Sequence, residues 1–291
     1  MRDCLAALAA STHAAFEVCI CENGGPEALA LMADALPDAL PGGQRVRLIE
    51  GAGNPGYAGG VNLCIRAAPE ADAWWVLNPD TCPDPQALAA LVARLEEGDV
   101  DAVGGVLCDP GGSVQALSGG RWRGWLARCE VPGMGASLEA MPDRAAVERE
   151  LAYISGASLL AGRRFAGQAG LMREDYFLYA EEVEWCLRGG KAGMRLGFAP
   201  GARVLHAQGA TTGSAAAVRS RSRLPIYLDE RNRLHVVRDT APRRLPVAAL
   251  GALALIFLRF ACKGAWRQTG HALAGWLAGL RNERGKPDWV T

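Results

Sequence analysis

The feature that most constrains the fold is a regular alternation of apolar runs and helix-like stretches over the first 107 residues. Strands and helices are predicted in alternation over residues 16–23, 27–36, 44–50, 58–68, 73–80, 85–98 and 100–107. This rhythm is typical of an α/β domain in which helices cover both faces of a doubly wound, mostly parallel sheet. The pattern weakens over 121–150, where we predict a loop. With 291 residues, half of them hydrophobic, the chain is long enough for such a domain and a smaller appendage.

Polar residues stand at the ends of two predicted strands. Glu22 and Asn23 follow the first apolar run, and Asn78 and Asp80 follow "AWWVL". Ligands of open α/β sheets bind beyond the carboxyl ends of the strands, so a binding site is expected there. A structural role is the alternative, because Asn-Pro-Asp also favours a turn and Glu22 can cap a strand end.

The segment "GAGNPG" at 51–56 has two interpretations. It matches the G-x-G-x-x-G pattern of dinucleotide-binding loops. However, the strand before it is not the first of the sheet, and Pro55 lies inside the turn. These two features favour a glycine-rich loop that leads into a helix.

The stretch "YFLYAEEVEWCLRGG" from Tyr176 to Gly190 surrounds three glutamates with aromatic side chains. Either the glutamates form a solvated helix face, or some of them are held in a pocket for proton chemistry. Glu184 lies four residues before Arg188, the favourable order for an ion pair on a helix, so a structural role is expected for it. Glu181 and Glu182 remain candidates for chemistry.

These motifs, taken in order, carry a resemblance to a known family. The segments "NPGYAGGVN", "LNPD", "SGASLLAGRR", "GLMREDYFLYAEEVEWCLR" and "APGARVLH" together resemble the family 2 inverting glycosyltransferases, and within them the bacterial rhamnosyltransferase group. The resemblance covers roughly residues 3–240. It implies a GT-A domain over 1–215, followed by a helical C-terminal extension over 216–291.

The resemblance also implies donor-binding and metal-binding residues. A carboxylate motif of this family, here Asn78-Pro79-Asp80, holds a divalent ion on the sugar-nucleotide diphosphate. Asp80 and His206, which ends "ARVLH", are the implied metal ligands. Hard oxygen ligands suit Mg²⁺ or Mn²⁺. Further donor contacts are expected from Glu22, Asn23, Asn54, Gly56 and Asn78.

The catalytic base implied by the resemblance is the second residue of the acidic pair, Glu182, with Glu181 as the next candidate. An inverting transfer needs one base to take the proton of the acceptor hydroxyl. The remaining implied residues would line the sugar or acceptor pocket, with core packing as the alternative; they are Gly156, Ala157, Tyr179 and Trp185.

The first strand of the family is absent from this sequence. Members of the family begin with an apolar strand that ends in Thr-Tyr-Asn, whereas this chain begins at "MRDCLAAL", inside the expected first helix. We expect the in-frame sequence upstream of Met1 to encode that strand. A parallel sheet without it would expose the edge of a neighbouring strand.

The charge distribution points to a partner for the C-terminal extension. Residues 1–215 hold 17 Lys and Arg against 26 Asp and Glu, whereas residues 216–291 hold 14 against 5. Trp266 and Trp276 lie among these basic residues, which suits a helix in the interface of an anionic membrane; a helical hairpin packed on the body is the alternative. Nucleic acid is not expected as a partner, because no nucleic-acid-binding motif accompanies the charge.

The resemblance implies transfer of a sugar, L-rhamnose from dTDP-rhamnose, to a lipid-linked or polysaccharide acceptor. A non-catalytic sugar-nucleotide-binding or scaffold protein is the alternative. Nine cysteines without a C-x-x-C pair favour reduced thiols, as in the cytoplasm. We therefore expect a cytoplasmic protein, peripheral on the inner face of the cytoplasmic membrane.

Overall fold

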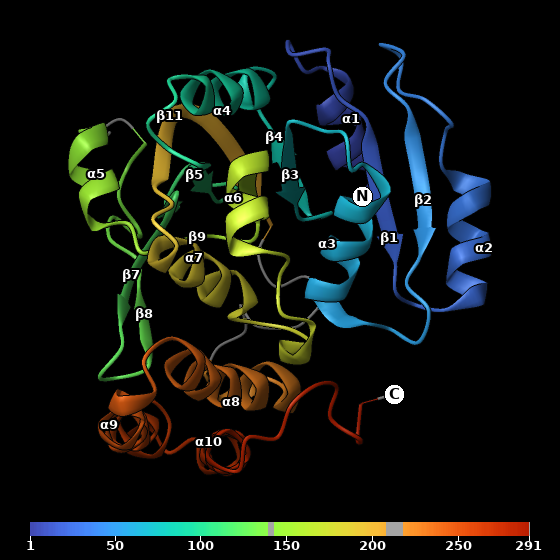
Figure 1. The fold of residues 1–291 in the computed structure, drawn as a ribbon. Coiled ribbons are helices and arrows are strands. Elements are labelled where there is room, and N and C mark those ends of the chain that lie inside the picture. Colours follow the sequence, from blue (N-terminus) through green and yellow to red (C-terminus); the bar gives the residue numbers. More distant parts are fainter. Residues whose placement is uncertain (139–142, 208–217, 291) are drawn as a thin grey trace.

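The predicted alternation is present in the structure, a computed structural model that describes residues 1–138, 143–207 and 218–290 (Figure 1). Short strands and helices follow one another as predicted over the first part of the chain. They are α1 (Arg2–Ala9), β1 (Val18–Glu22), α2 (Pro26–Ala35), β2 (Val46–Glu50), α3 (Gly56–Ala67), β3 (Ala73–Leu77), β4 (Thr81–Pro83), α4 (Ala87–Glu96) and β5 (Ala102–Cys108).

The region after β5 contains more regular structure than the sequence indicated. Where a loop was predicted over 121–150, the structure has strands and a helix. Within that range lie the end of β7 (Gly119–Arg123), β8 (Arg128–Glu130) and α5 (Arg144–Glu150). The other elements after β5 are β6 (Val114–Leu117), β9 (Tyr153–Ile154), β10 (Ser158–Gly162), α6 (Arg163–Ala169), α7 (Glu181–Lys191) and β11 (Leu196–His206). Short hairpin strands leave a weak pattern, because each has too few residues to show a period.

The main sheet has the order β3-β10-β5-β6-β7-β8, with β11 between β5 and β4 and with β9 beside β7. The prediction of a mostly parallel sheet is corrected here. The pairs β5–β11 and β1–β2 are parallel, whereas β10 runs antiparallel between β3 and β5. The hairpin strands after β5 are antiparallel as well, because short turns can join antiparallel strands without a crossover helix.

Strands β1 and β2 form a separate two-stranded sheet in the described part of the chain. Ile20 of β1 nevertheless shares one hydrophobic cluster with Trp75 and Leu77 of β3. The two sheets are therefore joined by side-chain packing and not by a backbone ladder.

The core lies along β5, whose seven residues are all buried. Gly105 permits a close approach to β11, because a Cβ atom there would lie 2.1 Å from the Ala202 carbonyl oxygen. On its other side β11 pairs with β4, so that His206 at the end of β11 lies opposite Thr81 at the start of β4. The polar residues at those strand ends are thereby brought together.

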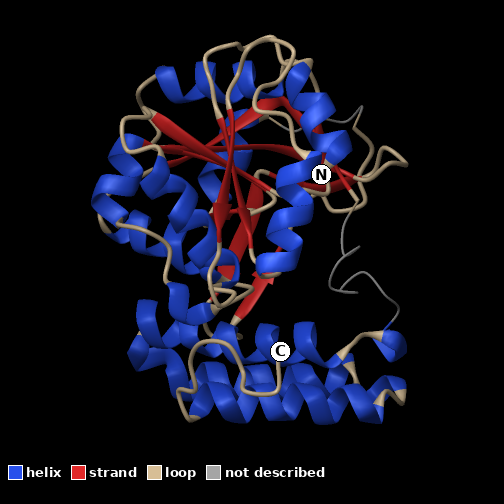
Figure 2. Ribbon diagram, turned by 90° about the vertical axis from the view of Figure 1, so that its right-hand side faces the viewer, coloured by secondary structure: helices blue, strands red, loops and turns tan. Residues whose placement is uncertain are grey.

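The C-terminal extension is a helical layer below the α/β body (Figure 2). It contains α8 (Arg223–Thr240), α9 (Leu245–Arg259) and α10 (Trp266–Leu280). The predicted boundary between 215 and 216 lies outside the described residues. Helix α8 is buried between the body and the outer helices, and its buried residues include Glu230, Arg231, Asn232 and His235.

Candidate active site

Asp80 and His206 meet where β4 pairs with β11. The register places His206 opposite Thr81, the residue after Asp80. The Asp80 Oδ1 atom lies 3.5 Å from His206 Nε2, and the two side chains are 24% and 11% exposed. The structure therefore brings the two predicted metal ligands together in a place that solvent can reach.

Gln115 determines which nitrogen of His206 carries the proton. The Gln115 amide nitrogen donates to the His206 carbonyl oxygen, so its Oε1 atom accepts from His206 Nδ1 at 3.1 Å. Burial lowers the pKa of His206 despite the nearby Asp80 carboxylate, so the ring is neutral at pH 7. The Nε2 lone pair then faces a carboxylate oxygen, an arrangement that suits a shared cation.

The donor set fits a divalent ion that is also bound by substrate. Among the described residues no group of three or more His, Cys, Asp or Glu side chains could hold a metal. Mg²⁺-type sites often use one or two protein ligands and complete their coordination with substrate phosphates and water. Asp80 and His206 could supply the protein ligands of that kind of site.

The glycine-rich loop 51–56 joins β2 to α3 and contacts the end of β1, where the Gly51 amide donates to the Glu22 carbonyl oxygen at 2.8 Å. Asn23 donates to the Gly56 carbonyl oxygen at 3.1 Å, and Asn54 accepts from the Gly56 amide at 3.2 Å. Gly56 has φ +76°, and a Cβ atom there would lie 2.1 Å from the Phe177 carbonyl oxygen. Glu22 accepts from the Gly24 amide at 2.5 Å, which is the strand-end cap given above as its alternative role.

Tyr57, which was not among the predicted site residues, lies near both the acidic pair and Asp80. Its hydroxyl donates to the Gly156 carbonyl oxygen at 2.6 Å. Burial raises its pKa well above 10, and the charges of Glu181, Glu182 and Asp80 raise it further. Tyr57 is thus within electrostatic range of both the acidic pair and the metal-ligand pair. Its position inside "NPGYAGGVN" was the available signal.

The small residues Gly156 and Ala157 hold two site residues through their backbone. The Gly156 carbonyl accepts from Tyr57, and the Ala157 carbonyl accepts from the Asn78 amide at 3.1 Å. A Cβ atom on Gly156 would lie 3.0 Å from the Tyr57 hydroxyl. Both residues are buried, so they position other residues at the site.

The acidic pair begins α7. Glu181 is 2% exposed, and its Oε2 atom has no hydrogen-bond partner among the described residues, whereas Glu182 is partly exposed. Burial raises the pKa of both carboxyls above their ordinary value of 4.5. Backbone N–H groups at the helix start lower the pKa of both, but they do not overcome burial. An orphaned buried oxygen is unfavourable on a charged carboxylate, so a proton resides on Glu181 at neutral pH.

The segment before the acidic pair has a strained backbone. Phe177, Tyr179 and Ala180 have φ values of 68°, 74° and 67°, although none of them is glycine. Such conformations cost roughly 1–3 kcal/mol each and are concentrated at functional sites. The strain turns the chain sharply before the first turn of α7.

The three other residues predicted in this segment, Glu184, Trp185 and Tyr179, each have different surroundings. Glu184 is buried and forms two hydrogen bonds with Arg188, at 2.8 and 3.0 Å, which confirms the predicted ion pair. Trp185 is corrected: it has no exposed surface, donates to the Gly170 carbonyl and packs against Phe165, so it is a core residue. Tyr179 lines a cavity of about 210 Å³ with residues of α8 and α9.

A larger hollow of about 800 Å³ lies between α5, α7 and the junction of α8 with α9. Among the described residues that line it, none is a predicted site residue. The candidate site lies elsewhere, around Asp80, Tyr57 and the acidic pair.

Comparison with known proteins gives two sequence matches. Residues 1–138 match the family model described as Glycosyl transferase family 2. A relative from Mycobacterium tuberculosis (strain ATCC 25618 / H37Rv), named N-acetylglucosaminyl-diphospho-decaprenol L-rhamnosyltransferase, is 31% identical in an alignment of 240 residues that covers 72% of this chain and 72% of the relative. The low-salt glycan biosynthesis hexosyltransferase Agl10 of Haloferax volcanii is 22% identical over 84% of this chain and 78% of that protein.

Solved structures share the fold at low identity. The mannosyltransferase PcManGT from Pyrobaculum calidifontis, in complex with GDP-Man and Mn²⁺, has a TM-score of 0.55 at 14% identity, over 97% of this chain and 83% of that one. S. aureus TarS 1-349 has a TM-score of 0.53 at 12% identity, over 96% and 76% of the two chains. These matches confirm the predicted GT-A fold with C-terminal helices.

Proposed function

Because the chain belongs to glycosyl transferase family 2, we propose that it transfers a sugar from a sugar nucleotide to an acceptor hydroxyl with inversion, and that Glu182 is the general base. The observation that carries this proposal is the acidic pair at the start of α7. Its two carboxyls have raised pKa values, and Tyr57 lies within electrostatic range of both them and Asp80.

Glu182 is the better base of the two because it is partly exposed, whereas Glu181 is buried. The acceptor oxygen forms a bond to the anomeric carbon while its proton passes to the Glu182 carboxylate. The bond between the anomeric carbon and the phosphate oxygen breaks, and the nucleoside diphosphate leaves with the electron pair. A raised pKa makes Glu182 a stronger base than a free glutamate, provided that the pH is high enough to ionise it.

Asp80 and His206 would hold the divalent ion, Mg²⁺ or Mn²⁺. When bound, such an ion stabilises the negative charge that develops on the leaving diphosphate. The hydrogen bond from the Tyr57 hydroxyl to the Gly156 carbonyl joins the first turn of α3 to the loop before β10.

The proposed donor is dTDP-rhamnose, and the proposed acceptor is a lipid-linked sugar diphosphate. The name of the mycobacterial relative, which states an L-rhamnosyl transfer to a decaprenol-linked sugar diphosphate, supports rhamnose as the sugar and a lipid-linked acceptor. The dTDP nucleotide of the donor rests on the family resemblance. Since fold alone does not determine the substrates, the assignments of the sugar and the acceptor rest on that relative.

We also propose that α9 lies in the interface of an anionic membrane. The segment Pro242–Lys263 is long and apolar enough to cross a membrane by length and composition, and 33% of its most apolar window is buried in the protein. Helix α9 itself has 15 residues, or about 22 Å, which is less than the hydrocarbon core of about 30 Å. A position along the membrane surface therefore suits it better.

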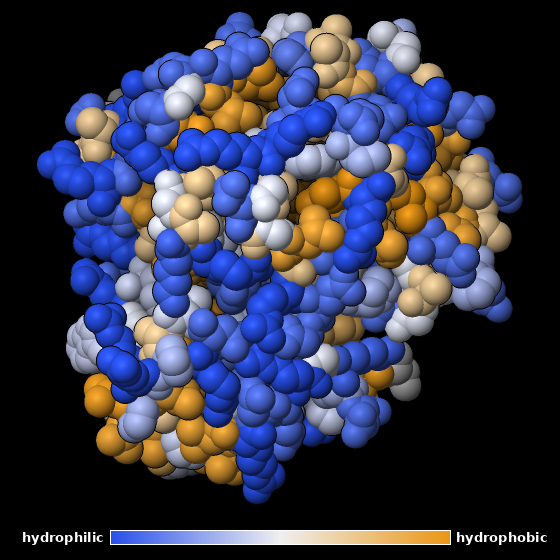
Figure 3. Space-filling model, in the orientation of Figure 1, coloured by the Kyte–Doolittle hydropathy of each residue, from blue (hydrophilic) through white to orange (hydrophobic). Residues whose placement is uncertain are grey.

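The exposed side of α9 supports this orientation. Val247, Leu250, Phe257 and Leu258 are 59%, 69%, 46% and 61% exposed and share one face of the helix. Apolar side chains gather over α9 in Figure 3. Exposed basic residues flank this face at both ends of the helix; they are Arg243, Arg244, Lys263 and Arg267. Apolar insertion and attraction to anionic lipid would then act together.

Incubation of the full chain with sugar nucleotides and decaprenol-linked N-acetylglucosamine diphosphate tests the proposal. With Mn²⁺ or Mg²⁺ present, we expect rhamnose to be transferred from dTDP-rhamnose and inverted at its anomeric carbon. Binding of sugar nucleotide without turnover for any donor would instead support the scaffold alternative. If another sugar nucleotide serves as donor, the protein is still a glycosyltransferase, but the proposed sugar is wrong.

A further inference from the structure

The strained segment Tyr176–Ala180 determines where the acidic pair lies. Residues in the left-handed region do not hold that conformation by themselves unless they are glycine. The three strained residues Phe177, Tyr179 and Ala180 must therefore be held by contacts from elsewhere in the chain. Most of these contacts come from α8, in the C-terminal extension.

Asn232 of α8 makes the central contacts. This side chain is fully buried, and its amide nitrogen lies 2.8 Å from the carbonyl oxygens of Leu178 and Tyr179 and 3.0 Å from that of Tyr176. Arg231 Nε donates to Asn232 Oδ1 at 2.9 Å. Because Oδ1 must face that donor, the amide nitrogen is directed at the strained segment.

Two further donors complete the attachment of the segment. Arg231 also donates to the Tyr176 carbonyl at 3.0 Å and to the Gly285 carbonyl at 2.8 Å. The Tyr57 amide donates to the Phe177 carbonyl at 2.7 Å. Every carbonyl from Tyr176 to Tyr179 is thus bound, and most of these bonds come from α8.

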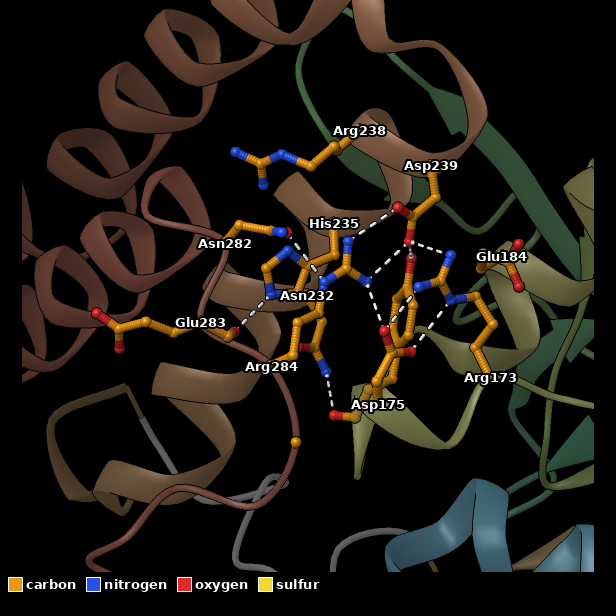
Figure 4. Close-up of polar contacts among 12 residues, drawn as sticks. Arg173, Asp175, Glu184, Asn232, His235, Arg238, Asp239, Asn282, Glu283 and Arg284 are labelled. Atoms are coloured by element: carbon orange, nitrogen blue, oxygen red, sulfur yellow. Dashed lines mark hydrogen bonds and ion pairs between the residues drawn. The ribbon is translucent and has the colours of Figure 1, made fainter.

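An ionic network anchors the same region at its start (Figure 4). Asp239 of α8 accepts from the Tyr176 hydroxyl at 2.8 Å and from Arg284 at 2.8 and 2.9 Å. Asp175 lies 2.6 Å from Arg173 and 3.3 Å from Arg284. The segment is therefore held from both α8 and the residues after α10.

We propose that Asn232 is a positioning residue for glycosyl transfer, because it fixes the backbone from which Glu181 and Glu182 project. It touches neither carboxylate and acts through the strained segment. The inference rests on the proposed role of Glu182 as base. It also makes α8 a required part of the catalytic unit, although α8 lies in the C-terminal extension.

The test compares Asn232→Leu with a matched control, Asn62→Leu. Asn62 is likewise a buried asparagine, and its side chain donates to the Met172 carbonyl oxygen and accepts from the Met172 amide. It lies on α3 and holds the chain before the strained segment. Each full-length variant is examined for thermal stability, for hydrogen exchange of peptides within 177–184, and for kcat and donor KM with dTDP-rhamnose. If Asn232→Leu does not fold, Asn232→Ser, which retains one shorter donor, takes its place.

We expect both variants to lose stability. Only Asn232→Leu should accelerate hydrogen exchange within 177–184, by about tenfold or more relative to Asn62→Leu, because it alone breaks the hydrogen bonds that hold this segment. Its kcat should fall about 10²-fold with donor KM nearly unchanged, since misplacement by about 1 Å has that effect. Equal exchange in the two variants, or an unchanged kcat in Asn232→Leu, would overturn the inference. The exchange comparison remains decisive even if dTDP-rhamnose is not the donor.

Discussion

Substitution of Asp80 tests whether a metal ion bound at this residue contributes to sugar-nucleotide binding. Asp80→Asn keeps the shape of the side chain but removes the charge that would hold a cation beside His206. We predict that Mn²⁺ no longer strengthens sugar-nucleotide binding, whereas metal-independent binding persists. Calorimetric titration with and without Mn²⁺ measures both quantities.

The control for that experiment is Asp84→Asn, an exposed aspartate four residues further along the chain. It should retain the Mn²⁺ effect. If Asp80→Asn retains the effect as well, Asp80 is not a metal ligand.

Glu181 gives a prediction about stability and pH. Its folded pKa is raised above the ordinary 4.5 by burial, so folding favours its protonated form. That contribution to the free energy of unfolding is fully present below pH 4.5 and is lost as pH rises through the folded pKa. Glu181→Gln is neutral at every pH and escapes this loss.

The stability of Glu181→Gln relative to the unmodified protein should therefore increase from pH 5 to pH 9. Thermal unfolding at matched ionic strength measures the difference. A difference that stays constant with pH would show that Glu181 has an ordinary pKa in the folded state. Exposed Glu27→Gln on α2 serves as the control and should show little change.

At the scale of elements, α9 gives a prediction about membranes. Leu250 and Leu258 lie on its exposed face, whereas Leu31 is a similarly exposed leucine, 73% accessible, on α2. Burying a leucine contributes roughly 1.5–3 kcal/mol, so the double variant Leu250→Glu/Leu258→Glu should bind phosphatidylglycerol vesicles at least about 100-fold more weakly. Leu31→Glu should bind as the unmodified protein does.

Vesicle sedimentation at low and high salt measures this binding. Added salt should weaken the binding of the unmodified protein, because its basic flanks contribute through screened charges. Equal binding by the double variant and the unmodified protein would exclude α9 as the membrane contact. Point variants are preferable to truncation after Thr240, since truncation would remove Arg284, which binds Asp239 and Asp175.

For the whole molecule, local patterns predicted the α/β architecture and long-range contacts decided the rest. The strands and helices up to β5 were predictable because their periods are visible within each segment. The antiparallel insertion of β10 between β3 and β5 depends on pairing between distant segments, which no local pattern shows. The fold as a whole followed from the family resemblance.

Some residues of the candidate site could likewise be predicted from the sequence, and others could not. Asp80 and His206 were paired by the family resemblance, and the β4–β11 register explains why they lie together. Their role as metal ligands stays a prediction. Trp185 was assigned to the pocket wrongly, because an aromatic residue beside a motif has the same appearance whether it faces core or cleft. Asn232 could not be selected, since its role consists of hydrogen bonds to backbone about 55 residues away. Tyr57 stood inside a family motif and was overlooked, because its hydrogen bond to Gly156 joins distant segments.

The central claim is that Glu182 takes the proton of the acceptor. The most direct measurement is the transfer rate of Glu182→Gln, which keeps the shape of the side chain but cannot accept the proton, alongside its affinity for sugar nucleotide with Mn²⁺. We predict that kcat falls by about 10²–10⁴-fold while donor affinity stays within about twofold of the unmodified protein. Near-normal turnover by Glu182→Gln would contradict the claim and make Glu181, the adjacent carboxyl, the next candidate.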